Sequence, residues 1–181
     1  MRTSAFTLIE LLIVVAIIAI LAGLAVPNLL EAQTRAKVSR VRADLRTIAT
    51  ALEAYRVDEN RYPPSTLIPL FRRLVPLTTP IQYIASVPTD VFQTQDAGAG
   101  PWRSRGNYAY GAMPIAGESR WALASDGPDL RGNHHGIQFY PGHSPDIWEN
   151  PDSGFDFVRY DPTNGTVSAG DIWRISDFNA E

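Results

Sequence analysis

The hydrophobic residues of this 181-residue chain fall into two different patterns. Residues 6–26 form an almost unbroken apolar run, FTLIELLIVVAIIAILAGLAV, in which Thr7 and Glu10 are the only polar side chains. A helix rises about 1.5 Å per residue, so this run is about 31 Å long, close to the thickness of the hydrocarbon layer of a bilayer. The pattern therefore predicts a membrane-spanning helix at the start of the chain.

The second pattern is periodic and begins after Pro27. Apolar residues recur at spacings of three, four, three, four and three, which is typical of one face of a helix. We expect the helix to continue over residues 28–58 and to pack this stripe on a sheet of the same chain. A short coiled coil is the alternative, although the stripe is shorter than three heptads. The stripe consists of Val38, Val41, Leu45, Ile48, Leu52 and Tyr55.

Pro27 separates the two patterns. It lacks the N–H that would bond to the carbonyl of Gly23, and its ring crowds the same carbonyl. We therefore expect a kink between Gly23 and Pro27.

The rest of the chain predicts short strands joined by long loops. Pro63 and Pro64 end the helix, and residues 59–106 form a connecting segment with a short second helix over 67–77. Residues 107–181 predict an antiparallel sheet with long loops, which makes the fold class α+β. The expected strands are 107–113, 120–124, 155–160 and 171–175, with a hairpin loop at 161–165.

Composition removes several kinds of chemistry. The chain has no cysteine, which excludes disulfides, thiolate metal sites and a cysteine nucleophile. Its net charge of -3 gives no reason to expect nucleic-acid binding. Charge is nevertheless uneven, since residues 31–46 carry a net +3 and residues 120–181 a net -6. Solvated faces explain this, and so does a basic stem that meets lipid or the acidic head of another copy.

Glu10 is the anomaly of the apolar run. A carboxylate within hydrocarbon costs about 2.5–3.5 kcal/mol on insertion scales, and the run contains no Lys or Arg to offset it. Glu10 either lies in the wet headgroup layer or pairs with a charge from another molecule. The second possibility includes an amino terminus that cleavage has exposed.

The segment Ala5-Phe6-Thr7-Leu8-Ile9-Glu10-Leu11-Leu12 closely resembles the processing motif of type IV pilins and type II secretion pseudopilins. The resemblance implies that a prepilin peptidase cleaves between Ala5 and Phe6 and methylates the new amino group of Phe6. It also implies that Glu10 pairs with this amine on a neighbouring subunit. The family usually has glycine at the position of Ala5. The rival interpretation is a secretory signal peptide cleaved before Val26.

The resemblance divides the chain into a leader (1–5), a transmembrane and filament-core helix (6–27) and a periplasmic globular domain (28–181). It implies a major pseudopilin of the G type, held in the bacterial inner membrane with its amino terminus in the cytoplasm. The expected partners are further copies, minor pseudopilins, prepilin peptidase, the lipid bilayer and an assembly platform with a separate ATPase motor. The alternatives are a surface type IV pilus subunit and a secreted binding protein or enzyme.

Residues 83–90 and 121–129 also resemble the family, the latter at the strand that enters its calcium loop. The resemblance implies calcium ligands at Ser125, Asp126 and Asp129, with Asp171 as a further acidic position. Simple turn hydrogen bonds are the alternative for this loop. No motif of an enzyme occurs in the sequence, so we expect no catalytic activity. The remaining features are the histidines 134, 135 and 143, whose spacing does not support a zinc site, and an insertion at 136–155.

Overall fold

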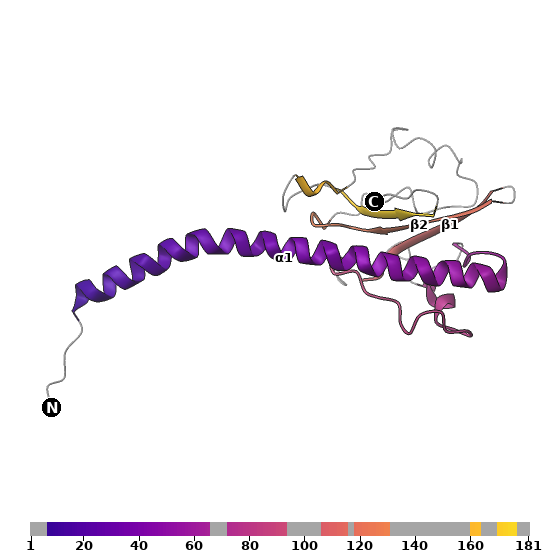
Figure 1. Ribbon diagram of the computed structural model, residues 1–181, viewed down its shortest axis with the longest axis horizontal. Helices are drawn as coiled ribbons and strands as arrows, with labels where there is room; N and C mark the ends of the chain where they lie inside the picture. Colours follow the sequence, from indigo (N-terminus) through magenta and orange to yellow (C-terminus); the bar gives the residue numbers. More distant parts are fainter. Residues whose placement is uncertain are drawn as a thin grey trace, which may run out of the picture.

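The computed structural model describes residues 7–65, 72–93, 106–115, 118–130, 160–163 and 170–176. These residues form one long helix and a small antiparallel sheet that lies along the second half of the helix (Figure 1). This is the predicted α+β architecture. The elements are α1 (Leu8–Glu59), the 3-10 helix η2 (Val75–Leu77), β1 (Ala109–Ile115), β2 (Glu118–Ser125) and β3 (Ile172–Ile175).

α1 is 52 residues long and includes both sequence patterns. It begins after Thr7 and ends at Asn60, which adopts the left-handed conformation with φ 53° that commonly closes a helix. Pro27 lies inside the helix, and α1 continues past it without interruption. The axis of its amino-terminal half curves (Figure 1). The helix is continuous between Gly23 and Pro27, where the sequence predicted a kink.

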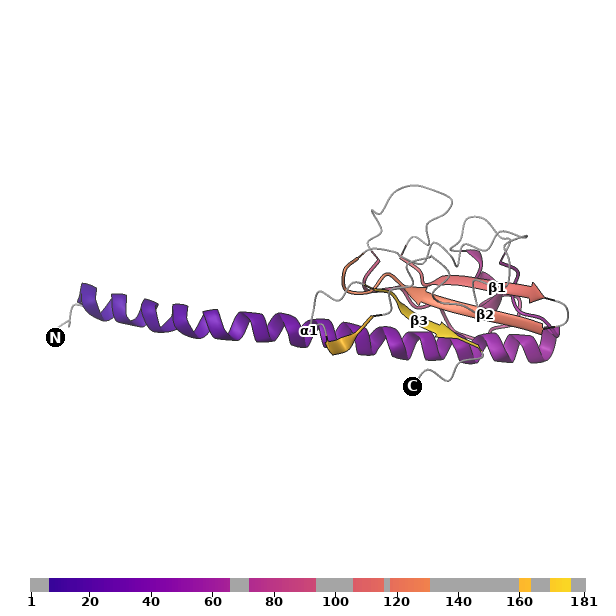
Figure 2. The ribbon, with the colours of Figure 1, turned by 90° about the horizontal axis from the view of Figure 1, so that it is seen from above.

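The apolar stripe of α1 is buried along its whole length. Five of its six residues have at most 4% of their surface exposed, and Tyr55 has 8%. Ala49 and Ala51 are buried beside them. The stripe packs in one core with residues of the sheet, among them Tyr108, Trp121 and Leu123, and the sheet lies against this half of α1 in both views (Figures 1 and 2). Intramolecular packing is therefore confirmed over the coiled-coil alternative.

The sheet has the strand order β1-β2-β3, and both neighbouring pairs are antiparallel. Ala112 pairs with Trp121 in the first ladder, and Ser125 pairs with Ile172 in the second. The sequence predicted all three strands within about two residues at each end. The β2–β3 pairing brings the carboxyl end of β2 next to the residue before β3.

Other predicted elements differ from the structure or lie outside the described residues. The described residues of 67–77 contain 3-10 conformation, including the helix η2, and no α-helix, because Pro76 has no N–H and cannot continue an α-helix from the preceding turn. Residues 155–159 lie outside the described residues, and Tyr160 is not in a strand. In the expected hairpin loop, Asp161 accepts a hydrogen bond from the N–H of Thr163 at 2.8 Å, and 164–169 are not described.

Candidate functional site

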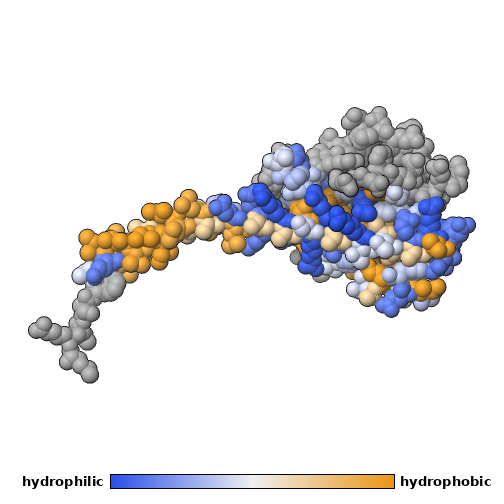
Figure 3. All heavy atoms as spheres, viewed as in Figure 1, coloured by the Kyte–Doolittle hydropathy of each residue, from blue (hydrophilic) through white to orange (hydrophobic). Residues whose placement is uncertain are grey.

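The first 23 residues of α1, Leu8 to Leu30, are exposed on every side. We call this segment the apolar shaft. Its large hydrophobic side chains have between 46% and 79% of their surface exposed, the lowest at Val14 and the highest at Leu8. Figure 3 shows the shaft as an almost continuous hydrophobic surface that projects from the folded part. A helix that is apolar all round requires lipid or other helices to cover it.

Among the described residues, α1 is the one helix that is long and apolar enough to cross a membrane. The window that passes this test lies near the amino terminus and is not buried within the protein. The core helix of a soluble protein can be equally long and apolar, but it is mostly buried, whereas the shaft is exposed. These properties fit a single-pass membrane anchor.

Thr7 and Glu10 form a capping box at the tip of the shaft. The N–H of Glu10 donates to Oγ1 of Thr7 at 3.3 Å. In return, Oε2 of Glu10 accepts from the N–H of Thr7 at 2.8 Å and from its hydroxyl at 2.7 Å. These contacts satisfy backbone donors that the first helical turn would otherwise leave open. Glu10 therefore has a local structural role as well as the predicted intermolecular one.

The spacing Thr-x-x-Glu is the sequence signature of a capping box, so this role was readable from residues 7–10. Both hydrogen-bond donors belong to a neutral residue. No basic side chain of the described residues forms an ion pair with Glu10. The negative charge thus remains available for a positive group of another molecule. Ala5 and Phe6, the predicted cleavage and methylation positions, lie outside the described residues.

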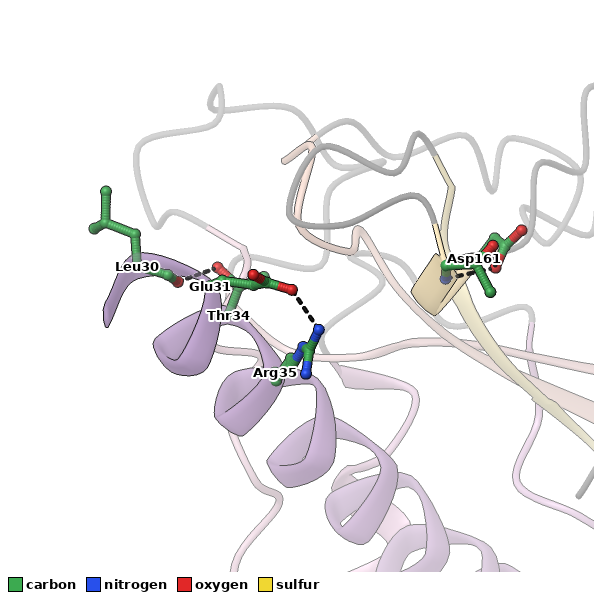
Figure 4. Close-up of polar contacts among 6 residues, drawn as sticks. Leu30, Glu31, Thr34, Arg35 and Asp161 are labelled. Carbon is green, nitrogen blue, oxygen red and sulfur yellow. Dashed lines mark hydrogen bonds and ion pairs between the residues drawn. The ribbon is translucent and has the colours of Figure 1, made fainter. Parts of the chain in front are cut away.

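The second part of α1, residues 31–59, begins with charged and polar side chains, and we call it the stem. Arg35 forms an ion pair with Glu31, and the hydroxyl of Thr34 donates to the carbonyl of Leu30 at 3.0 Å (Figure 4). Further along, Arg40 lies 3.8 Å from the carboxylate of Asp44. The transition from the shaft to the stem thus takes place within about one helical turn.

Polar contacts at the far end of the stem fix the sheet to the helix. Oε1 of Glu53 accepts from Nε1 of Trp121 at 2.7 Å and from the hydroxyl of Tyr62 at 3.0 Å. The guanidinium of Arg56 donates to the same hydroxyl at 2.8 Å and lies 5.1 Å from the centre of the Tyr62 ring. A helix residue, a loop residue and a strand residue are therefore joined through one carboxylate.

A similar contact lies nearer the shaft. The hydroxyl of Tyr108 donates to Oδ2 of Asp44 at 2.9 Å. Burial, together with the bond to this carboxylate, raises the pKa of Tyr108, which therefore stays a neutral donor. With the buried stripe between these two contacts, the stem and the sheet form one body, which we call the head.

The predicted calcium residues lie at the carboxyl end of β2. Ser125 and Asp126 are buried, Asp129 is half-buried, and the β2–β3 register places the buried Asp171 beside them. Gly127 makes this approach possible, because it has a φ of +70° and a Cβ there would overlap the carbonyl oxygen of Gly170. The segment that carries Asp171 therefore folds back toward this loop.

The side chains at this loop do not by themselves form a metal cage. Within the described ranges, no group of three or more histidine, aspartate or glutamate side chains is arranged so that it could hold a metal ion. The three histidines and the insertion at 136–155 lie outside those ranges. Calcium binding remains a prediction.

Asp90 is a buried acid near this loop that the sequence interpretation did not single out. It is 4% exposed, and its Oδ1 accepts from the N–H of Phe92 at 2.9 Å. Burial raises the pKa of Asp90, and the negative charge of Asp126 adds to this effect. The Phe92 N–H and polar groups of Ser125 and Asp126 partly offset the rise. Asp90 follows a Pro-Thr pair in a loop, and nothing in that pattern distinguishes a buried aspartate from an exposed one.

Comparisons with known proteins agree with this geometry. The family model for the "Prokaryotic N-terminal methylation motif" matches residues 1–26. That for "Type II secretion system (T2SS), protein G" matches residues 28–136, which is more than half of the chain. The first match covers the shaft up to the residue before Pro27, and the second covers the stem, β1 and β2.

Three curated relatives illustrate the similarity. The type II secretion system core protein G of Pseudomonas aeruginosa is 45% identical over 62 residues, which are 34% of this chain and 44% of that protein. The type IV major pilin protein PilA of Myxococcus xanthus is 46% identical over 61 residues, 34% of this chain and 28% of that protein. The type IV wide pilus major component PilA4 of Thermus thermophilus is 51% identical over 61 residues, 34% and 47% respectively.

The alignments span less than half the length of each of these three relatives. No solved structure matches the chain. The match over more than half of the chain nevertheless shows the family: the chain belongs to the type II secretion system protein G family.

Proposed function

We propose that this protein is a structural subunit of a pilin-like filament, the periplasmic pseudopilus of type II protein secretion. The observation that carries the proposal is the apolar shaft, which is exposed on all sides and continuous with a helix half that is buried in its own domain. The family match over residues 28–136 supports it. The role is mechanical and not catalytic.

Before assembly, the shaft lies in the inner membrane as a single span, with the head on the periplasmic side. During assembly, shafts of neighbouring copies pack together and replace the lipid contacts that each copy loses. Because helix packing in lipid gains little from the hydrophobic effect, a charge pair at the tip of the shaft adds both energy and register. Energy for extraction comes from a separate ATPase motor that acts through an inner-membrane platform.

Processing prepares this charge pair. A prepilin peptidase cleaves between Ala5 and Phe6 and methylates Phe6, and the resulting amine meets Glu10 of a neighbouring copy. The methylation-motif match over residues 1–26 supports this step. The capping box leaves the Glu10 carboxylate in place at the first turn of α1, with its charge unneutralised by any described basic residue.

A surface type IV pilus subunit is the second candidate. The similarity to the pilins of Myxococcus xanthus and Thermus thermophilus favours it, because both alignments are as long as those to the core G proteins. Localisation separates the two candidates. A pseudopilin remains in the periplasm when the secretion machinery is present at native level, whereas a pilus subunit is sheared from the cell surface.

The proposal is tested by three substitutions in the full chain. We expect Glu10→Ala to abolish filament assembly in cells, scored by cross-linking of subunits, while the head stays folded. Glu10→Gln keeps an oxygen for the capping box but removes the charge, so we expect it to fail as well. Glu59→Gln, at the exposed far end of α1, is the matched control and should assemble normally.

The glutamine variant decides between the two roles of Glu10. If Glu10→Gln assembles as the wild type does and only Glu10→Ala fails, the capping box is sufficient and the intermolecular charge pair is wrong. If the mature chain does not begin at Phe6, which amino-terminal sequencing shows directly, the processing step is wrong.

Calcium is a further proposal for the loop of Ser125, Asp126 and Asp129 with Asp171. It is supported by the foldback that places Asp171 beside the end of β2. If the site exists, adding calcium to chelator-treated protein raises the thermal midpoint of unfolding with a saturable dependence on calcium concentration. An unchanged midpoint after calcium addition contradicts the proposal. An equal rise with magnesium also contradicts it, because the effect is then not specific to calcium.

A further inference from the structure

A group of basic side chains follows the apolar shaft at the start of the stem. Arg35, Lys37, Arg40 and Arg42 are all exposed on the stem, and we call them the basic collar. In Figure 3 the surface changes from hydrophobic to hydrophilic where the shaft ends and this segment begins. The collar thus occupies the position that a membrane surface occupies if the shaft spans the bilayer.

The distances along the helix fit the headgroup layer. At 1.5 Å per residue, Arg35 lies about 7.5 Å beyond Leu30, and Arg42 lies about 18 Å beyond it. Side chains on a helix lean toward its amino terminus, and long basic side chains extend their charged ends toward an interface. The headgroup layer on each side of the hydrocarbon is about 5–7 Å thick. Arg35 and Lys37, about 7.5 and 10.5 Å beyond Leu30, therefore reach the phosphates of the leaflet next to the head, whereas Arg40 and Arg42, about 15 and 18 Å beyond it, lie outside the headgroup layer.

Basic side chains lie on two opposite sides of the helix, and the buried stripe that begins at Val38 lies between them. With about 100° between successive residues, Arg35 and Arg42 lie on one side, and Lys37 and Arg40 lie on the opposite side. A neighbouring protein would contact one side of the stem, whereas a membrane surface meets every side at the same depth. The arrangement favours lipid over a protein partner.

The charges of the collar are incompletely neutralised. Arg35 pairs with Glu31, and Arg40 lies 3.8 Å from Asp44, which also accepts a hydrogen bond from Tyr108. Lys37 and Arg42 form no ion pair with any acidic side chain that the structure describes. Counting the four basic and these two acidic residues leaves a net charge of +2.

Three of the described acidic residues of the head are buried and do not offer a partner to the stem of another copy. Asp90, Asp126 and Asp171 are all at least 95% buried, so their carboxylates do not face a neighbouring copy. Asp126 and Asp171 belong to residues 120–181, so part of the net charge of -6 in this range is not on the surface that another subunit's stem would meet.

We propose that Arg35 and Lys37, the two residues of the basic collar nearest the shaft, bind the phosphate groups of anionic phospholipids in the leaflet next to the head. This proposal rests on the proposed membrane anchoring of the shaft. The collar then sets the depth of the subunit in the bilayer and holds the head close to the surface before assembly. Each basic residue near an anionic surface contributes about fivefold to such binding, and salt weakens it.

The test uses the full chain and its retention of lipid. Purified protein in detergent is mixed with equal amounts of phosphatidylglycerol and phosphatidylcholine, and native mass spectrometry counts the lipids that stay bound. We expect the wild type to retain phosphatidylglycerol preferentially. The double variant Arg35→Gln/Lys37→Gln removes the two collar residues that reach the headgroup layer. Both side chains are exposed and the exposed ion pair of Arg35 with Glu31 contributes little to stability, so the variant preserves the fold, and its preference should fall at least fivefold.

A matched control separates the collar from net charge. Arg61→Gln/Arg72→Gln removes the same charge from exposed positions beyond the end of α1, and its preference should stay within twofold of the wild type. Equal retention of both lipids by the wild type, or an equal fall in both double variants, overturns the proposal. Unchanged lipid retention with reduced cross-linking between copies also overturns it and assigns the collar to a second subunit.

Failure of the anchoring is visible separately. Alkaline extraction of vesicles that contain the protein shows whether the shaft is inserted. A chain that alkali removes contradicts both the anchoring and the lipid site. A chain that resists alkali but lacks the lipid preference contradicts the lipid site alone.

Discussion

The shaft and the stem are two halves of one helix with opposite relations to their surroundings. Both are continuous α-helix from Leu8 to Glu59. The shaft is apolar on every side and contacts no other part of the described chain, whereas the stem is apolar along one stripe and buries that stripe under the sheet. The comparison shows that hydrophobicity alone does not make a core. Periodic hydrophobic residues bury themselves in the chain's own domain, and continuous ones require a surface from outside.

The largest expected effect comes from a pair of identical substitutions in the two halves. Leu45→Ala removes a fully packed side chain of the stem that is 2% exposed, and should lower the free energy of unfolding of the head by about 2–5 kcal/mol. Leu21→Ala in the shaft, 61% exposed, should leave that value unchanged. Chemical unfolding of the full chain in detergent, followed by tryptophan fluorescence, measures both. Equal destabilisation by the two variants would mean that the shaft also folds onto the head.

The polar joint at the end of the stem comes next. Glu53→Ala leaves Nε1 of Trp121 and the hydroxyl of Tyr62 without their acceptor, and should cost about 1.5–3 kcal/mol, the range for hydrogen bonds to a charged group. Glu31→Ala, which breaks an exposed ion pair at the start of the stem, should cost less than about 0.5 kcal/mol. The same unfolding assay compares them, and a shift in the emission of Trp121 reports the local change.

Two glycines sharpen the comparison at the level of the backbone. Gly127→Ala forces a side chain onto a residue with φ +70° and into the carbonyl of Gly170, so it should destabilise the head by about 1–3 kcal/mol. Gly23→Ala meets no atom within 4 Å, and should favour helix in the shaft by about 0.5–1 kcal/mol. Thermal unfolding measures the first change, and helicity by circular dichroism of the full chain in micelles measures the second. A neutral Gly127→Ala would contradict the close approach of the two loops.

The smallest effect is a pH dependence that belongs to the head alone. Burial raises the pKa of Asp90 in the folded state above its ordinary value of 3.8, which applies to the unfolded state. At a pH between the unfolded and the folded pKa, the folded state therefore binds more protons than the unfolded state. The contribution of Asp90 to stability should therefore decrease as pH rises from 3.8 through the raised pKa, and should be constant above it. The difference in unfolding free energy between wild type and Asp90→Asn, measured at a series of pH values, shows this slope. A flat difference would mean that the pKa of Asp90 is the same in both states.

The sequence predicted the parts of this protein in which a local pattern determines the structure. The stripe from Val38 to Tyr55 identified the buried face of the stem, because residues at helical spacing all lie on one face of the helix and that face packs against the rest of the domain. The three strands followed from short apolar runs between turn residues. The capping box at Thr7 and Glu10 was equally readable, but Glu10 drew attention for its charge instead of its spacing.

Other features depend on contacts between distant segments, which no local pattern contains. The burial of Asp90 results from its position beside the end of β2. The joint of Glu53 with Trp121 links residues 68 positions apart. The short helix expected near Leu74 shows that a local pattern can also mislead. Its apolar residues have helical spacing, but Pro76 prevents an α-helix there, and the described residues form a 3-10 helix instead.

α1 is an uninterrupted helix of 52 residues, about 78 Å along its axis, and it joins the shaft directly to the head. Raising the head by one helical turn, about 5.4 Å, moves three to four shaft residues out of the hydrocarbon layer and into water. The shafts of neighbouring copies must cover these residues as they leave the membrane. In the proposed pseudopilus, growth therefore depends on a neighbouring shaft being in place at each step.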